Sequence, residues 1–169
     1  NGTGFWTLMS SGSWLGHGQD TIGTTPNHMG AWEKLQLGWL DYATVAHDQD
    51  ATVVLGPSMH ATKKGQALIV TLPEDANGRD RFYIAENRQY AGYDSTLRVG
   101  PYNFGWLETK PNWVEHFPYQ NGLLISYWNT AVSNNNTRTH PGTGRILPVD
   151  ARPGALTWSD GTVARNRIQ

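Results

Sequence analysis

The chain of 169 residues contains no cysteine, which excludes disulfide bridges, thiolate metal sites and a cysteine nucleophile. Charged residues make up only 16% of the chain, and the net charge is −1, so there is no electrostatic basis for binding nucleic acid or an anionic membrane surface. No apolar run reaches transmembrane length, and no signal peptide opens the chain. We therefore expect a protein that is cytosolic or has lost its leader.

Glycine and aromatic residues are abundant instead, with 19 Gly, 8 Trp and 7 Tyr. This composition favours a protein of strands and loops over a helical bundle. The start inside a glycine-rich loop and the end in a strand-like segment suggest an internal piece of a longer polypeptide. We predict a single domain or fragment over 1–169, with a loop and helix in 1–40 and a β-rich part in 41–169.

The predicted fold class is α+β, with one main helix followed by a mostly antiparallel β-rich region. Thr25 as N-cap and Pro26 in the first turn predict a helix over about 27–37, which Gly38 ends. Apolar runs and turn residues predict strands over 51–55, 67–72, 81–88, 122–128 and 145–150.

Two further features of this region follow from the turn residues and the aromatic residues. Asn77-Gly78 makes 67–72 and 81–88 an expected antiparallel hairpin. Residues 90–120 show no clean period and are predicted to form a long aromatic loop, of a length that is often functional.

The most informative segment is Gly4–Gly16, which combines aromatic rings and Met9 with a loop of small residues. A turn containing methionine lies under the zinc ion of metzincin-type metalloproteases, where the thioether forms an apolar floor and does not bind the ion. The small residues after it leave room for a substrate side chain. The predicted pocket wall therefore consists of Ser10, Ser11, Gly12, Ser13 and Trp14. The alternative is that Met9 fills a gap in the core.

The zinc-binding helix that accompanies such a turn is missing, because His-Glu-x-x-His occurs nowhere in the chain. None of the six histidines forms an i, i+4 pair on the predicted helix, so we predict no zinc ligand among them. For His28 a surface or capping role is favoured over facing a metal, and for His116 and His140 hydrogen bonding within loops is favoured.

Polar residues near the predicted long loop have two interpretations. A buried Glu86–Arg88 pair that fixes the sheet to this loop is preferred, and calcium binding through Asp94 or Glu86 is the alternative. The segment 75–80 resembles a calcium loop superficially, but it lacks the glycine and glutamate positions of an EF-hand, so a hairpin turn explains it better.

Segments in fixed order along nearly the whole chain resemble the immune inhibitor A type of secreted bacterial metallopeptidase, the M6 peptidases. These segments are Gly4–Trp14, Gly30–Leu40, Tyr83–Gln89, Gly92–Asp94, Gly122–Ile125, and His140–Gly142 with Leu147–Ala151.

The resemblance implies a metzincin-like C-terminal subdomain of a secreted, extracellular zinc endopeptidase acting on protein or peptide substrates. Its His-Glu-x-x-His helix would lie upstream of Asn1, in the remainder of the same polypeptide, with two histidines on zinc and the glutamate activating water. Met9 would be the Met-turn residue, and 10–14 the pocket wall. Calcium is a further cofactor that the resemblance implies, without ligands assigned.

Two other functions stay open at this point. The first is a non-catalytic binding or structural module derived from a peptidase. The second is a carbohydrate-binding β domain rich in aromatic residues, although Trp32, Trp39 and Trp128 lie in apolar contexts that indicate core packing.

The missing zinc helix predicts that the 169-residue chain alone does not hydrolyse peptides. Incubation of the pure chain with casein and added zinc should release no peptides above background. Cleavage that a chelator abolishes would contradict the prediction.

Overall fold

The computed structural model describes residues 2–15, 23–60, 65–98, 120–136, 138–140, 142–151, 156–157 and 159–165. The helices in this part are the 3₁₀ helices η1 (Gly4–Trp6), η2 (Ser11–Trp14) and η3 (Gly92–Arg98) and the α-helix α1 (Ala31–Gln36). The strands are β1 (Tyr42–Ala46), β2 (Ala67–Leu72), β3 (Arg81–Arg88), β4 (Gly122–Asn129), β5 (Ile146–Pro148), β6 (Leu156–Thr157) and β7 (Val163–Arg165).

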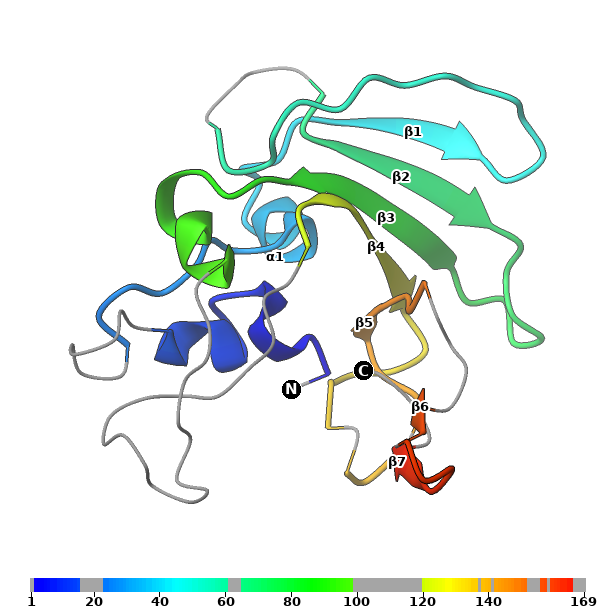
Figure 1. The fold of residues 1–169 in the computed structure, drawn as a ribbon. Helices are drawn as coiled ribbons and strands as arrows, with labels where there is room; N and C mark the ends of the chain where they lie inside the picture. Colours follow the sequence, from blue (N-terminus) through cyan, green and yellow to red (C-terminus); the bar gives the residue numbers. More distant parts are fainter. Residues whose placement is uncertain are drawn as a thin grey trace.

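Strands β1 to β5 form one sheet in chain order, and β6 pairs with β7 separately (Figure 1). β1 runs parallel to β2, and every other neighbouring pair of the large sheet is antiparallel. The architecture is compatible with the α+β prediction. The metzincin-like character of the subdomain stays a prediction.

The main core lies between α1 and one face of the sheet. Its fully buried members are Ala31, Ala67, Ile69, Ile84 and Ile146. Trp128 meets Trp32 edge-on, with ring centroids 6.5 Å apart, and lies 4.6 Å from Phe82. The expected core packing of Trp32 and Trp128 is confirmed, whereas Trp39 is 66% exposed and the expectation for it is wrong.

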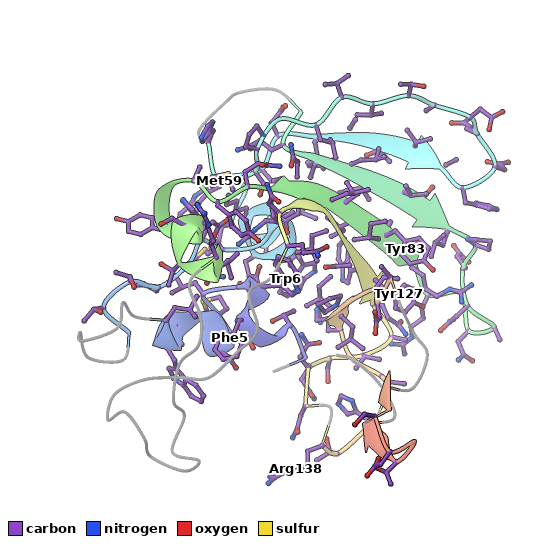
Figure 2. The ribbon with its side chains drawn as sticks, viewed as in Figure 1. Phe5, Trp6, Met59, Tyr83, Tyr127 and Arg138 are labelled. Carbon is purple, nitrogen blue, oxygen red and sulfur yellow. The ribbon has the colours of Figure 1, made fainter. Side chains whose placement is uncertain are left out.

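The opposite face of the sheet is also apolar. Tyr83 on β3 pairs with Tyr127 on β4, and the ring centroids are 5.7 Å apart (Figure 2). Val70 on β2 is paired with Tyr83, and Leu147 on β5 is paired with Tyr127, so four neighbouring strands each contribute one residue to a row across this face.

A second, smaller core fixes the N-terminal loop. Its buried residues, Leu15 and Leu97, pack with Phe5, Trp6 and Tyr90, so residues of η1 and the end of the N-terminal loop meet η3. Figure 2 shows Phe5 and Trp6 in this region. Part of the predicted aromatic loop is therefore a 3₁₀ helix. Residues 99–119 of that predicted loop lie outside the described residues.

The predicted hairpin of 67–72 and 81–88 is confirmed, with the same bounds for both strands. Its turn is closed by Asp75, whose Oδ1 accepts hydrogen bonds from the N–H groups of Asn77 (2.8 Å) and Arg79 (3.0 Å). This carboxylate is used to shape the turn, as the hairpin interpretation requires.

The predicted helix begins later than expected. α1 starts at Ala31 rather than at residue 27, and Gly30 before it is extended (φ −72°, ψ 168°). The reason is that residues 27–30 use their backbone groups in tertiary contacts. For example, the N–H of His28 donates to Asp94 Oδ1 at 2.9 Å. Such contacts override the local start signal of Thr25 and Pro26.

The predicted strand over 51–55 is wrong, and β1 was not predicted. In 51–55 the side chain of Val54 is 86% exposed, and these residues join no strand. β1 is instead an edge strand whose side chains alternate between exposed and half-buried. β5 is confirmed in shortened form, with Pro148 on an edge strand as expected.

A search of the described residues for helices long and apolar enough to cross a bilayer finds none.

The end of α1 generates a prediction about Gly38, which has φ +71°. The N–H of Trp39 donates to the Lys34 carbonyl (2.8 Å), and that of Gly38 to the Leu35 carbonyl (3.1 Å), which is a Schellman motif. A Cβ on Gly38 would meet nothing within 4 Å, so Gly38→Ala should lose about 1 kcal/mol through backbone strain alone.

Urea unfolding measures this loss. Gly38→Asn is the matched control, because asparagine tolerates the left-handed conformation better than alanine. Equal stability of wild type and the alanine variant would contradict the role of this glycine.

Candidate functional site

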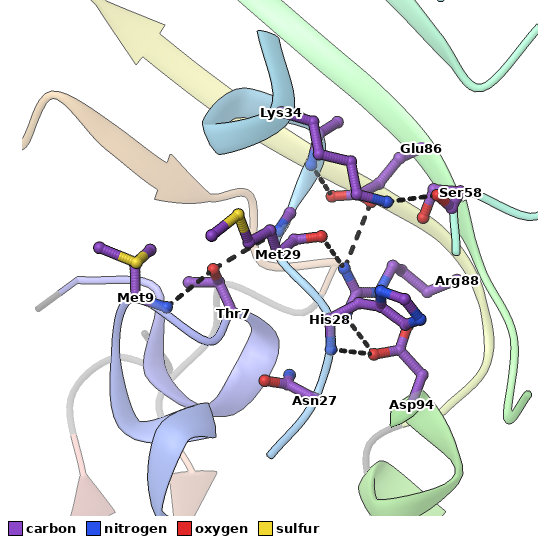
Figure 3. Close-up of polar contacts among 12 residues, drawn as sticks. Thr7, Met9, Asn27, His28, Met29, Lys34, Ser58, Glu86, Arg88 and Asp94 are labelled. Atoms are coloured by element: carbon purple, nitrogen blue, oxygen red, sulfur yellow. Dashed lines mark hydrogen bonds and ion pairs between the residues drawn. The ribbon is translucent and has the colours of Figure 1, made fainter. Parts of the chain in front are cut away.

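The Met9 turn is a hydrogen-bonded loop between η1 and η2 (Figure 3). The N–H of Ser10 donates to the Thr7 carbonyl (3.1 Å), and the N–H of Met9 donates to Thr7 Oγ1 (3.3 Å). The Ser13 N–H (3.3 Å) and hydroxyl (2.9 Å) both donate to the Ser10 carbonyl. The Met9 side chain is 64% exposed. The alternative that Met9 fills a core gap is therefore wrong.

The residues predicted as pocket wall run from the interior to the surface: Ser10 and Gly12 are buried, Ser11 and Ser13 are half-buried, and Trp14 is 42% exposed. A Cβ on Gly12 would lie 2.1 Å from Asn27 Oδ1 and 2.5 Å from the Thr7 carbonyl oxygen. Only glycine fits there. Asn27 in turn donates from Nδ2 to the Phe5 carbonyl at 2.6 Å.

Residues 27–31, here called the spine segment, lie behind the Met9 turn. The N–H of Leu8 donates to the His28 carbonyl (3.2 Å), and the N–H of Gly30 donates to Thr7 Oγ1 (3.4 Å). Thr7 Oγ1 thus accepts from both the spine segment and Met9. These bonds fix the position of the turn relative to the spine segment.

On the other side of the spine segment lies a buried group of charges, the Arg88 cluster, which consists of Glu86 and Arg88 on β3 and Asp94 on η3. Arg88 Nη2 lies 2.8 Å from Asp94 Oδ1, and Nη1 lies 3.4 Å from Glu86 Oε2. Exposed fractions are 4%, 1% and 0% for Glu86, Arg88 and Asp94. The predicted buried Glu86–Arg88 pair is confirmed.

The Arg88 cluster holds the backbone of the spine segment through three hydrogen bonds (Figure 3). They run from the His28 N–H to Asp94 Oδ1 (2.9 Å), from Arg88 Nη1 to the Met29 carbonyl (3.3 Å) and from the Ala31 N–H to Glu86 Oε1 (3.0 Å). Each bond involves an ionised side chain, and bonds of this kind are about twice as strong as neutral ones.

Burial dominates the electrostatics around the Arg88 cluster. It raises the pKa of Asp94, against the opposing effect of Arg88, and it raises the pKa of Glu33. It lowers the pKa of Lys34, whose Nζ donates to the Ser58 carbonyl. Removing these charges from water is costly, and the ion pairs and backbone bonds offset that cost.

The predicted capping role of His28 is wrong, because Gly30 is the residue before α1, and the predicted surface role is met only in part. His28 lies before the helix, half-buried, and its ring packs edge-on against Tyr93 with centroids 5.3 Å apart. Burial, followed by the charges of Lys34 and Arg88, lowers its pKa to about 4. Its imidazole is therefore neutral at pH 7.

An open groove of about 370 Å³ lies beside His28. Its lining is mostly apolar and includes Leu8, Pro26, Met29, Trp39 and Tyr93. Trp39 and Tyr93 are 66% and 65% exposed, so two aromatic rings border the groove next to the Met9 turn.

Among the described residues, the other histidines bring no further site together. The ring nitrogens of His140 lie 2.8 Å from the Thr143 carbonyl oxygen and 2.9 Å from Asn134 Oδ1, which confirms the predicted loop hydrogen bonding. His17 and His116 lie outside the described residues.

The described residues do not fit a zinc site, because no group of three or more His, Asp or Glu side chains converges among them. The Arg88 cluster does not suit calcium either. Three of its carboxylate oxygens bond the Arg88 guanidinium or backbone N–H groups, so a positive charge already occupies the place beside them.

Two family models match this chain. The VEG domain of immune inhibitor A-like metallopeptidases matches residues 76–169, and the catalytic domain of the immune inhibitor A peptidase M6 matches residues 1–40. The chain belongs to the immune inhibitor A-like metallopeptidases. A search among curated proteins found no match.

The elements of the site fall in two different matched regions of this metallopeptidase chain. The Met9 turn, the spine segment and α1 lie in the part matched by the catalytic domain, and the Arg88 cluster lies in the part matched by the VEG domain. Hydrogen bonds between the cluster and the spine segment therefore join the two parts. The predicted division into 1–40 and 41–169 stays a prediction.

Sequence reasoning found the Met9 turn and the Glu86–Arg88 pair but missed the spine segment between them. It assigned residues 27–30 to the helix and gave Asp94 no role in holding them. The one available signal was Gly30, which interrupts the predicted helix.

The lowered pKa of His28 generates a prediction about stability. Between the unfolded value of 6.5 and the folded value of about 4, the unfolded chain binds more protons on His28 than the folded chain does. Stability should therefore fall as the pH drops through this window, and His28→Gln should show a shallower fall.

Urea unfolding at several pH values from 7 to 4 measures the two slopes, with His47→Gln at an exposed position as the matched control. Identical slopes for wild type and His28→Gln would contradict the prediction.

Proposed function

We propose that this chain supplies the Met-turn and the substrate-pocket wall of a secreted, zinc-dependent endopeptidase that cleaves protein substrates. In this proposal Met9 is the Met-turn residue, and residues 10–14 line the pocket. The zinc ligands belong to a His-Glu-x-x-His helix in another part of the polypeptide.

The observation that carries the proposal is the exposed thioether on a fixed turn. The Met9 side chain is 64% exposed, while its backbone and that of its neighbours are fixed through Thr7 and Ser10. An exposed methionine on a mobile loop would need no explanation. Here a rigid framework presents an apolar, polarisable side chain outward, as the floor of a cleft completed by another segment requires.

The small residues after Met9 fit the same role. Gly12 lets η2 approach Asn27 and the Thr7 carbonyl, so the loop packs closely on the spine segment. Trp14 at its far end is 42% exposed and can contact a substrate. No step of hydrolysis is assigned to these residues, because the zinc ion and its ligands would lie elsewhere.

The membership of the family favours a peptidase over a carbohydrate-binding domain. The remaining alternative is a module derived from a peptidase that has lost its metal. Zinc content and casein hydrolysis of the complete polypeptide distinguish the two, since the derived module would have neither.

Replacement of Met9 in the complete polypeptide tests the role of the turn. Met9→Ala should lower kcat/KM for a protein substrate by at least about tenfold, because small misplacements near a reacting centre have effects of this size or larger. Gly12→Ala should have a similar effect, since the new Cβ would displace the loop from Asn27.

Val54→Ala is the control for loss of an exposed apolar side chain far from the turn, because Val54 is 86% exposed. Its kcat/KM should equal the wild-type value. Wild-type activity in both Met9→Ala and Gly12→Ala would refute the proposed role.

A further inference from the structure

The spine segment is bonded on both of its sides, and the two sets of bonds share the same residues. His28 donates its N–H to Asp94 (2.9 Å) and accepts from the Leu8 N–H at its carbonyl (3.2 Å). One residue therefore contacts both the Arg88 cluster and Leu8, which leads into the Met9 turn. A displacement of its backbone would move both contacts.

Thr7 makes a second connection. Its Oγ1 accepts from the Gly30 N–H (3.4 Å) and from the Met9 N–H (3.3 Å), and the residue is 2% exposed. Gly30 lies between Met29, whose carbonyl accepts from Arg88, and Ala31, whose N–H donates to Glu86. A continuous set of hydrogen bonds thus runs from the cluster through the spine segment to the amide of Met9.

The contacts on the cluster side are strong for a physical reason. Arg88 and Asp94 are 1% and 0% exposed, so water cannot replace a lost partner, and bonds to buried charges gain from the low local dielectric. By comparison, the bonds within the Met9 turn join neutral groups, at distances of 2.9 to 3.3 Å. The stronger set should determine the position of the weaker one.

The geometry points to Arg88 and Asp94 as positioning residues of the Met9 turn: they fix the spine segment, and the spine segment places Thr7 and Met9. The importance of this placement for peptide hydrolysis rests on the proposed function. The family matches show that this positioning crosses from one matched region to the other. Side chains in the part matched by the VEG domain would set the geometry of a loop in the part matched by the catalytic domain.

The test uses the complete polypeptide labelled with ¹³C at its methionine methyl groups, with the Met9 signal assigned through Met9→Leu. Asp94→Asn keeps the size of the side chain and an acceptor for the His28 N–H but removes the charge that pairs with Arg88. Arg88→Lys keeps the charge but cannot bond Asp94 and Met29 through a planar fork. In each folded variant the Met9 methyl signal should move by more than its linewidth or split.

Two further variants separate positioning from loss of stability. Thr7→Val removes the shared oxygen and leaves the Arg88 cluster intact, so it should move the Met9 signal in the same direction, even where a cluster variant fails to fold. Arg79→Lys and Asp80→Asn, both at exposed positions in the hairpin loop, are the matched controls and should leave the signal in place.

An unmoved Met9 signal in folded Asp94→Asn or Arg88→Lys, or in folded Thr7→Val, overturns the inference. Casein hydrolysis by the same samples is the second readout, and kcat/KM should fall by about tenfold or more in the variants whose signal moves. A moved signal with unchanged hydrolysis would support the positioning of the turn and count against the proposed function, so the two failures are distinguishable.

Discussion

The arrangement of this chain depends on the buried guanidinium of Arg88. It is 1% exposed and needs acceptors on several sides, which Asp94, Glu86 and the Met29 carbonyl provide. A buried charge that lost its ion-pair partners would be left uncompensated, at a cost of about 3–5 kcal/mol. This requirement draws residues 27–31 to β3 and η3, although that segment is far from both in the sequence.

The same requirement explains local structure that propensity alone does not. Residues 27–30 stay outside the helix because their N–H and carbonyl groups are used by Asp94, Arg88 and the Met9 turn. α1 begins only where Glu86 accepts the Ala31 N–H. Its six residues make it too short to be stable alone, so packing against β3 and the cap from Glu86 maintain it.

Prediction from the sequence succeeded where the pattern was local. β2, β3 and β4 have strong apolar runs bounded by turn residues, and all were found within one residue of their ends. The prediction failed where pairing decided the outcome. Residues 51–55 are apolar but join no strand, whereas Tyr42–Ala46 carries a weak pattern and becomes a strand because β2 offers it a free edge.

The sequence by itself determined the family resemblance, the β-rich character, the central hairpin and the presence of a methionine in a loop of small residues. Only the tertiary structure decided that Met9 faces outward and that Asp94 holds the backbone of His28. The physical reason is that burial and long-range hydrogen bonds depend on which segments meet. Here the buried charges of residues 86–94 bond backbone groups of residues 28–31, which lie outside any local sequence window.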